Sequence, residues 1–406
     1  MPSIDDLVSV AEAFQKSPVY IDRDRCVAVR NRNASCRRCV DACPCDAIEV
    51  MNNEITLDVR ACSACGACTA VCPTGALVPL RPSDDDLFDA CVQAAGASVG
   101  RAVIACARIS SRREADPTRY AEVPCLARVD ESVLMRLAAE GVREIVLVDG
   151  ACATCRYRAI DEGVNITCGA FQQLVGAQGA EIPISRTSAF PHDMLIEDAT
   201  GLFGTTRRDF FSETARSARD LVSTAAKAAL ESELADAKEL SIGARLRAGE
   251  NGALPTFEIR RHTDIVNAMD ALGQSVVEEV VARVFATVEI DVEKCNGCGM
   301  CAVFCPTAAI KRDERKKPYT NPEYLEFWAS ECIQCNLCQD VPLTAEPHGA
   351  AKRKARPRIL ARTQAERLGG ARGRPQIEHH RIEAEQLLGG NDRTDFQALL
   401  PTHVLA

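Results

Sequence analysis

Cysteines at short, regular intervals give this chain its most evident capacity for chemistry. Sixteen of its 22 cysteines fall into two blocks, residues 26–72 and 295–338, and each block contains one run of the form C-x2-C-x2-C-x3-C-P, at 62–73 and at 295–306. So short a loop lets three thiolates bind one four-iron cube, while the proline directs the fourth thiolate to a neighbouring cube. Each block is therefore predicted to hold a pair of iron–sulfur clusters, whose chemistry is one-electron transfer.

Zinc and disulfide bonds are the alternative uses of clustered cysteines. A structural zinc ion needs two C-x2-C pairs with a variable spacer, and it has no use for a third cysteine at the same interval or for the following proline. Disulfide frameworks are typical of short secreted domains, whereas this chain has 406 residues and only 22 cysteines. The pattern therefore favours iron–sulfur clusters in a reducing compartment, which predicts a cytoplasmic location.

The first block departs from the strict spacing at its first motif. The position three residues before Cys36 is Asn33, and Cys26 stands farther back, behind a polar, arginine-rich segment that is typical of an exposed ligand loop. Cys45 is left over and is predicted to be a small buried residue. The crossover rule then gives site I the ligands Cys26, Cys36, Cys39 and Cys72, and site II the ligands Cys43, Cys62, Cys65 and Cys68.

The second block lacks its last closing cysteine. Its run at 332–338 resembles the ferredoxin domain of pyruvate:ferredoxin oxidoreductases, and the crossover rule gives site III the ligands Cys305, Cys332, Cys335 and Cys338. Site IV keeps only Cys295, Cys298 and Cys301. Three alternatives remain for it: a 3Fe-4S centre, a 4Fe-4S cube with an oxygen or nitrogen ligand from Asp340, Glu346 or His348, or an unoccupied remnant. Three or four clusters are thus expected, and loss of one thiolate should raise the potential of site IV.

Between the blocks, short apolar runs alternate with helical patterns. The runs at 102–106, 121–125 and 144–148 are predicted strands, and a helix is predicted at 130–140, which is typical of a parallel sheet. The carboxyl ends of parallel strands meet at one edge of a sheet, where sites are normally built. Four cysteines end or follow these strands and could bind one compact metal centre, the central site: Cys106, Cys125, Cys152 and Cys155.

The runs VPCLARVD at 123–130 and VLVDGACATCRY at 146–157 resemble the delta-subunit family of methyl-viologen-reducing hydrogenases. Members of that family pass electrons between a hydrogenase or formate dehydrogenase and heterodisulfide reductase, so the resemblance implies a 2Fe-2S cluster at the central site. It covers about a quarter of the chain. The last two cysteines are spaced x2 rather than x4, and the first strand offers one cysteine where a pair is common. Packed free thiols or a vestigial site remain the alternative.

These patterns predict a multidomain chain of the α+β and α/β classes. It combines two ferredoxin-like cluster domains, a central small parallel α/β domain and a helical linker. The expected parts are an N-terminal helix with the first cluster domain, the central domain, the linker, the second cluster domain and a basic flexible tail, at 1–82, 84–186, 187–285, 286–349 and 350–406.

Composition and charge restrict the partners. A net charge of −9 argues against general nucleic-acid binding, and the absence of a long uninterrupted apolar run argues against an integral membrane segment. The segment 351–375 has nine basic residues and only Glu366 as an acid. It is interpreted either as a solvated flexible tail or as an arm that docks on an acidic partner subunit.

No motif of a nucleotide-binding, hydrolytic or zinc-protease site is found beside these cysteines. The leading hypothesis is therefore an iron–sulfur electron-transfer subunit that links a donor protein to a catalytic oxidoreductase subunit. Two alternatives stay open. One is an oxidoreductase with its own substrate site at the open coordination position of site IV, and the other is an iron-sensing or redox-sensing interaction protein.

Overall fold

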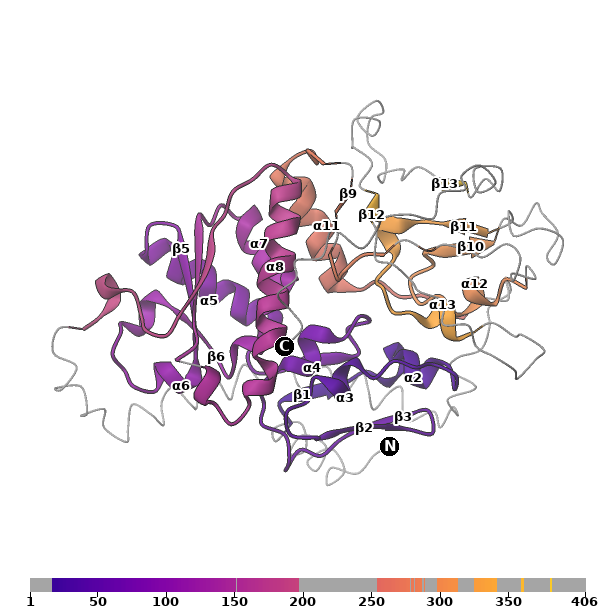
Figure 1. Cartoon of the computed structure of the whole chain (residues 1–406), viewed down its shortest axis with the longest axis horizontal. Coiled ribbons are helices and arrows are strands. Elements are labelled where there is room, and N and C mark those ends of the chain that lie inside the picture. The colour runs from indigo at the N-terminus through magenta and orange to yellow at the C-terminus, as the bar shows by residue number, and fades with distance from the viewer. Residues whose placement is uncertain are drawn as a thin grey trace, which may run out of the picture.

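The computed structural model describes ten segments of the chain. The described residues are 17–150, 152–196, 254–277, 279–280, 282–286, 288, 298–312, 325–341, 359–360 and 380–381. Residues 1–16, where the N-terminal helix is expected, and residues 197–253 of the expected linker lie outside them, as do Cys295, Glu346 and His348. Figure 1 shows three packed parts, with the central α/β domain at one end, the second block at the other and the first block below and between them.

The first block is built from two antiparallel strand pairs. Strand β1 (Val19–Ile21) pairs with β4 (Leu77–Pro79), and β2 (Ile48–Met51) pairs with β3 (Glu54–Leu57). Pairing of its first and last strands closes the block. The cysteine runs lead into three short helices, α2 (Val27–Arg30), α3 (Arg38–Asp41) and α4 (Ala67–Val71). The ligand loops thus lie between β1 and β2 and between β3 and β4 in the chain, so the two strand pairs fix both ends of each loop.

The central domain contains the predicted parallel sheet, with one strand more than expected. The strand order is β6-β5-β7-β8, and all neighbouring strands are parallel. The three predicted strands are confirmed, and the fourth, β8, follows a helix, α8, that the sequence analysis did not predict. The strands are β5 (Arg101–Cys106), β6 (Ala121–Val123), β7 (Glu144–Val148) and β8 (Ile184–Thr187).

Side chains of this sheet alternate between two cores. Ile104 and Leu147 face the larger core, which helices α5 (Asp84–Ala97), α7 (Glu131–Ala139) and α8 (Asp161–Ala177) cover. Their neighbours on the opposite face contact Phe190, Met194 and Ile109. Burial on both faces explains why the strands are nearly continuous apolar runs.

Helix α11 (Arg260–Leu272) also belongs to the larger core. It packs against α7 and contributes Ile265 and Ala268, both nearly inaccessible to solvent. The expected linker, 187–285, therefore includes a helix that is part of the central domain. The sequence shows its apolar stripe, but the stripe does not tell which core it joins.

The second block repeats the short helices and adds small sheets. Helices α12 (Met300–Phe304) and α13 (Leu337–Asp340) accompany an antiparallel pair, β10 (Ile310–Arg312) and β11 (Leu325–Phe327). Within the C-terminal segment expected to be flexible, two dipeptides are described as strands. β12 (Ile359–Leu360) pairs with β9 (Glu279–Val280), and β13 (His380–Arg381) pairs with β11.

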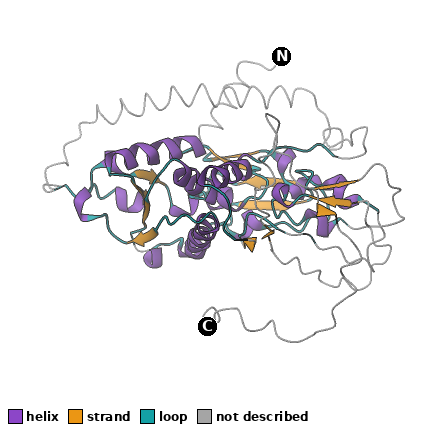
Figure 2. Cartoon of the chain, turned by 90° about the horizontal axis from the view of Figure 1, so that it is seen from above, coloured by secondary structure: helices purple, strands orange, loops and turns teal. Residues whose placement is uncertain are grey.

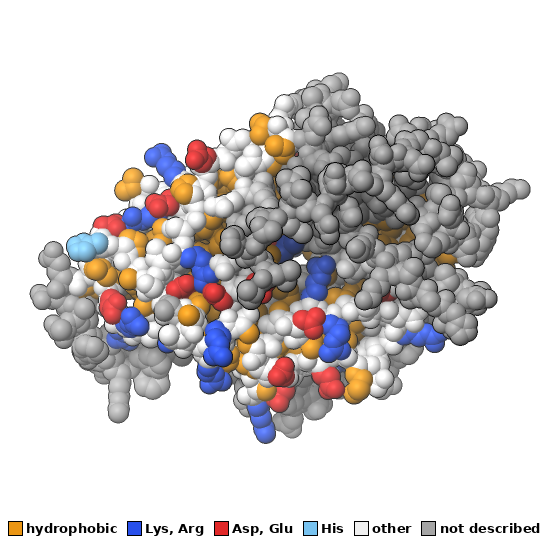
Figure 3. Space-filling view, in the orientation of Figure 1, with side chains coloured by type: hydrophobic (Ala, Val, Ile, Leu, Met, Phe, Trp, Pro, Cys, Tyr) orange, Lys and Arg blue, Asp and Glu red, His pale blue; other side chains and the backbone are white. Residues whose placement is uncertain are grey.

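The described surface is polar and mixed in charge. Figure 3 shows acidic and basic side chains interspersed over the described parts of one face, and Figure 2 shows the elongated outline of the molecule from above. Among the helices in the described ranges, none combines the length and the apolar character needed to cross a bilayer.

Candidate metal centres

The ligand loops of the two blocks share one backbone conformation. In the run 62–68, Ala64 and Gly66 have φ of 58° and 78°, and in the run 332–338 the equivalent Gln334 and Asn336 have φ of 54° and 62°. Left-handed residues at these two places curl the loop around its cysteines. The backbone N–H of Ala64 donates to Cys62 Sγ at 3.4 Å. The two blocks thus fold the same loop, although their sequences there differ.

A second shared turn follows the closing cysteine of three motifs. The N–H of Ala47 donates to Cys43 Sγ at 3.3 Å, four residues after the cysteine. Hydroxyl groups two residues after Cys72 and Cys305 lie 3.7 and 3.8 Å from the sulfur atoms. The third residue after the cysteine is left-handed in all three motifs, with φ of 51° at Asp46, 61° at Gly75 and 57° at Ala308. Polar hydrogens are therefore available to stabilise thiolates.

The four cysteines assigned to site I lie together. Burial raises the pKa of the Cys39 thiol to about 12, and the negative charges of Cys72, Cys26 and Cys36 raise it further. Burial also raises the pKa of Cys26 to about 11, against the opposing effect of backbone N–H groups of Val29 and Ala28. Cys72, which ends the second motif, thus acts on the thiols of the first motif, as the crossover rule predicts.

The four cysteines assigned to site II also lie close to one another. Burial raises the pKa of the Cys68 thiol, and the charges of Cys65, Cys62, Cys39 and Cys43 raise it further. Sites I and II touch where Cys39 and Cys68 meet, because both pack in the same core.

Cys45 differs from the expectation of a buried residue. It is half-buried, and its charge acts on both Cys62 and Cys65, so it is a fifth thiol beside site II. Its position two residues after Cys43 is the one signal in the sequence that indicates this place.

Site III gathers the cysteines that the crossover rule assigns to it. Burial raises the pKa of Cys338 well above its ordinary value, and the charges of Cys335, Cys332, Cys301 and Cys305 add to this effect. Cys301, a site IV residue, therefore lies next to site III.

Asp340 was one expected oxygen donor for site IV. Its carboxylate accepts hydrogen bonds from the backbone N–H of Ser35 at 2.7 Å and from the Ser35 hydroxyl at 3.0 Å. Asp340 is thus engaged with the first block in this structure.

The central site lies at the carboxyl edge of the parallel sheet, where sequence reasoning placed it. Cys106 ends β5, Cys125 follows β6, and Cys152 and Cys155 follow β7. Burial raises the pKa of Cys125 to about 12, opposed by the N–H of Ala127 and supported by the charges of Cys106, Cys65 and Cys152. The charge of Cys155 in turn acts on Cys106. All four thiols are therefore neighbours.

The donor sets of the four sites consist of thiols, which are the usual ligands of iron–sulfur clusters. Every described cysteine is a free thiol, and within the described ranges no three His, Cys, Asp or Glu side chains converge on a position for one metal ion. A four-iron cluster takes four thiolates, and sites I, II and III each have four cysteines assigned to them.

The sites also form a row. Cys125 of the central site and Cys65 of site II pack against the same core. Sites II and I share the core of the first block, and Cys36 of site I packs with Cys335 of site III in a third, smaller core. The order along the molecule is therefore central site, site II, site I, site III.

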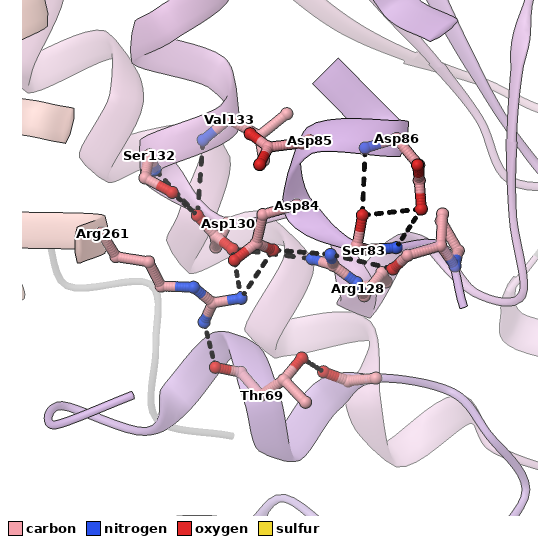
Figure 4. A network of polar contacts seen from close by, with 12 residues as sticks. Thr69, Ser83, Asp84, Asp85, Asp86, Arg128, Asp130, Ser132, Val133 and Arg261 are labelled. Carbon is pink, nitrogen blue, oxygen red and sulfur yellow. Dashed lines mark hydrogen bonds and ion pairs between the residues drawn. The ribbon is translucent and has the colours of Figure 1, made fainter. Parts of the chain in front are cut away.

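A buried polar network joins site II to the central domain (Figure 4). Arg128 donates to Asp84 at 2.6 Å and to the carbonyl of Pro82 at 3.2 Å, and its side chain is 1% exposed. Arg261 of α11 pairs with Asp130 at 2.8 Å and donates to the carbonyl of Thr69, in α4 of the first block. The network thus joins α5, the turn that contains Arg128, and α11 to α4, which carries the site II ligand Cys68.

Gly66 sets the closeness of this contact. A Cβ atom at Gly66 would lie 2.7 Å from Cδ and 2.9 Å from Cβ of Arg128, and the residue has a φ of +78°. The site II loop can therefore lie against Arg128 only because position 66 carries no side chain.

Comparisons with known proteins agree with the cysteine pattern. The model of a 4Fe-4S dicluster domain family matches residues 32–76 and 294–341. A 7Fe ferredoxin of Hydrogenibacillus schlegelii is 33% identical over 58 residues, which are 14% of this chain and 68% of that protein. A ferredoxin of Methanothermococcus thermolithotrophicus is 33% identical over 60 residues, which are 14% of this chain and 92% of that protein. No solved structure matches.

Proposed function

The chain belongs to the ferredoxin family, and from this premise we propose that it relays electrons through several iron–sulfur clusters between a donor protein and a catalytic oxidoreductase subunit. The observation that carries the proposal is the row of thiol groups from the central site to site III. A row of adjacent one-electron centres suits transport across a protein better than chemistry at one place.

We assign 4Fe-4S clusters to sites I, II and III and a 2Fe-2S cluster to the central site. These clusters would supply one-electron oxidation and reduction, with potentials set by charge, hydrogen bonds to sulfur and exposure. The protein contributes backbone N–H groups that favour the ionised thiols, such as those of Ala67 at Cys65 and Leu337 at Cys335. It also excludes water, because Cys26, Cys39 and Cys68 are each less than a tenth exposed.

Site IV differs from the other sites of the two blocks because only three cysteines are assigned to it. The relative named a 7Fe ferredoxin supports a three-iron centre there, held by Cys295, Cys298 and Cys301. Of these, Cys298 and Cys301 lie in the described segment beside site III.

The central domain is the proposed contact with the partner enzyme. Its likeness to hydrogenase delta subunits supports a partner of the hydrogenase, formate dehydrogenase or heterodisulfide reductase kind. Its cysteine-bearing sheet edge is one end of the row of sites, which is where a partner would exchange electrons. The basic segment 351–375 is the proposed arm for an acidic partner, and the cytoplasm is the proposed location.

Iron and acid-labile sulfide analysis with electron paramagnetic resonance (EPR) spectroscopy on oxygen-free full-length protein tests the cluster assignments. Cys72→Ser should remove the four-iron signal of site I, and Cys125→Ser should remove the two-iron signal of the central site. Cys91→Ala is the matched control, because Cys91 lies fully buried in α5 and belongs to no thiol group. Full iron content in Cys72→Ser would contradict the crossover assignment.

A reduction assay tests the relay. Dithionite should reduce the clusters of the wild-type protein, and an oxidised viologen dye should reoxidise them. Wild-type protein that contains iron but takes up no electrons would overturn the proposed function.

A further inference from the structure

The junction between the two cluster blocks is built by arginines of the site I loops. Arg30 ends α2, four residues after the site I ligand Cys26, and Arg38 lies between the site I ligands Cys36 and Cys39. Both side chains reach across to the second block. Arg30 lies in the segment 27–35 that was predicted to be an exposed ligand loop, but residues 27–30 form a buried helix; no role was predicted for Arg38.

Arg30 is almost completely buried, with 4% of its surface exposed. Its Nε donates to the carbonyl of Phe304 at 3.1 Å, and Phe304 directly precedes the site III ligand Cys305. Its Nη2 donates to the carbonyl of Pro255 at 2.6 Å, and the guanidinium lies over the ring of Phe257 at 5.7 Å. A buried cation is thereby fixed against the backbone of a site III ligand.

Arg38 makes the equivalent contact at a second site III ligand. Its Nη2 donates to the carbonyl of Gln334 at 2.6 Å, and Gln334 directly precedes Cys335. The same contact region is sealed by apolar packing of Val27 against Leu337 and Val341, with Cys36 and Cys335 beside them. Two arginines from site I therefore hold two ligand loops of site III.

Among the described residues, the hydrogen-bond partners of these two arginines carry no charge. Both donate to backbone carbonyls, which are neutral, whereas a carboxylate partner would neutralise the cation. Within the described ranges, the carboxylate of Asp340 also lies at this junction, where it accepts hydrogen bonds from Ser35 and acts on Cys36 of site I. The negative charges of Cys305 and Cys335 act on Arg30 and oppose the lowering of its pKa by burial.

We propose that Arg30 and Arg38 are positioning residues that clamp site I to site III and raise the reduction potential of the cluster held at site III. Positive charge beside thiolate ligands favours the reduced, more negative state of a cluster. The inference rests on the proposed function and specifies where electrons cross between the blocks. In each crossing, one site loses an electron and the other gains it, and no ligand changes.

Potentiometric titration of oxygen-free full-length protein, followed by EPR spectroscopy, tests this. Cys335→Ser first identifies the site III signal by its loss. Arg30→Met and Arg38→Met should then shift the midpoint potential of that signal to lower values at unchanged iron content. Arg38→Lys, which keeps the charge, should hold the midpoint potential close to its wild-type value. Arg37→Met is the matched control, because Arg37 is exposed and next to Arg38, and it should leave the potential unchanged.

Magnetic interaction supplies a second measurement. When sites I and III are both reduced, their spins should broaden or split each other's signals, and the interaction should weaken in the Arg30→Met Arg38→Met double variant. Unchanged potentials and unchanged interaction in iron-replete variants would overturn the inference. Failure of the proposed function looks different, because the wild-type protein would then show no reducible clusters at all.

Discussion

The first block meets its two neighbours through arginines in opposite electrostatic settings. Towards the central domain, Arg128 and Arg261 pair with the carboxylates of Asp84 and Asp130. Towards the second block, Arg30 and Arg38 donate to neutral carbonyls beside site III ligands. At the first junction the arginines are neutralised by carboxylates and stabilise the packing of the two domains. At the second junction the arginines keep their positive charge beside the ligands of site III.

The largest expected effect is at the first junction. Arg261→Met should destabilise the central domain by about 3–5 kcal/mol, because it leaves buried carboxylates without one of their two cations. Chemical unfolding followed by circular dichroism measures this. Arg260→Met on the same helix is the control, because Arg260 is 59% exposed and its pairing with Asp85 should contribute less than about 1 kcal/mol. Equal losses in the two variants would show that the network is not stabilising.

Comparison of Gly66→Ala with Gly75→Ala should separate the cost of left-handed backbone strain from the cost of a clash with Arg128. A left-handed alanine costs about 1–2 kcal/mol at either Gly66 or Gly75, but a Cβ at Gly75 meets no atom within 4 Å. Gly66→Ala should therefore lose more stability than Gly75→Ala and also lose site II iron, because Arg128 must move away. Identical unfolding and iron content in both variants would argue against close packing on Arg128.

Acid should weaken the first junction through Asp84. Burial raises the pKa of Asp84, but the charges of Arg261 and Arg128 outweigh burial and hold that pKa below its ordinary value. The carboxylate thus contributes stability above its unfolded pKa of about 3.9, and this stability is lost as pH falls through the lower folded value. Unfolding curves at a series of acid pH values should show a smaller pH dependence in Asp84→Asn than in the wild-type protein. The same pH dependence in both proteins would show that Asp84 does not contribute to the acid sensitivity of unfolding.

The smallest effect is expected at the rim of the second junction. Ser35→Ala removes a hydroxyl that donates to Asp340 at 3.0 Å, a bond that should contribute about 0.5–1.5 kcal/mol at most because Ser35 is exposed. Hydrogen exchange of the α13 amides should rise only slightly, with no shift of the site III potential. If the site III potential of Ser35→Ala shifted as much as that of Arg38→Met, the charge that sets this potential would be that of Asp340 rather than of the arginines.

Much of the fold and of the site arrangement was predictable from the sequence. Ligand spacing fixes loop length, so the crossover rule predicts Cys72 beside Cys36 and Cys39, whereas Cys26 was assigned to them despite an irregular spacing. The strands β5, β6 and β7 were predicted because both faces of the sheet are buried and their residues form continuous apolar runs.

The rest depends on docking between distant segments. Arg30 and Arg38 lie among polar residues, and nothing in their spacing shows that carbonyls more than two hundred residues away will accept from them. The helix α8 was not predicted because its glycines and polar residues weaken the apolar pattern. Helix α11 lies in the segment 187–285 that was assigned as a whole to a helical linker, because an apolar stripe does not specify its partner.

The shielding of Cys26, Cys39 and Cys68 has a consequence for maturation. In the closed first block these sulfur atoms present almost no surface to a scaffold protein that delivers iron and sulfide. We therefore expect these three ligands to bind their clusters before the block closes, whereas Cys36, Cys43, Cys62 and Cys72 stay partly exposed in the closed block.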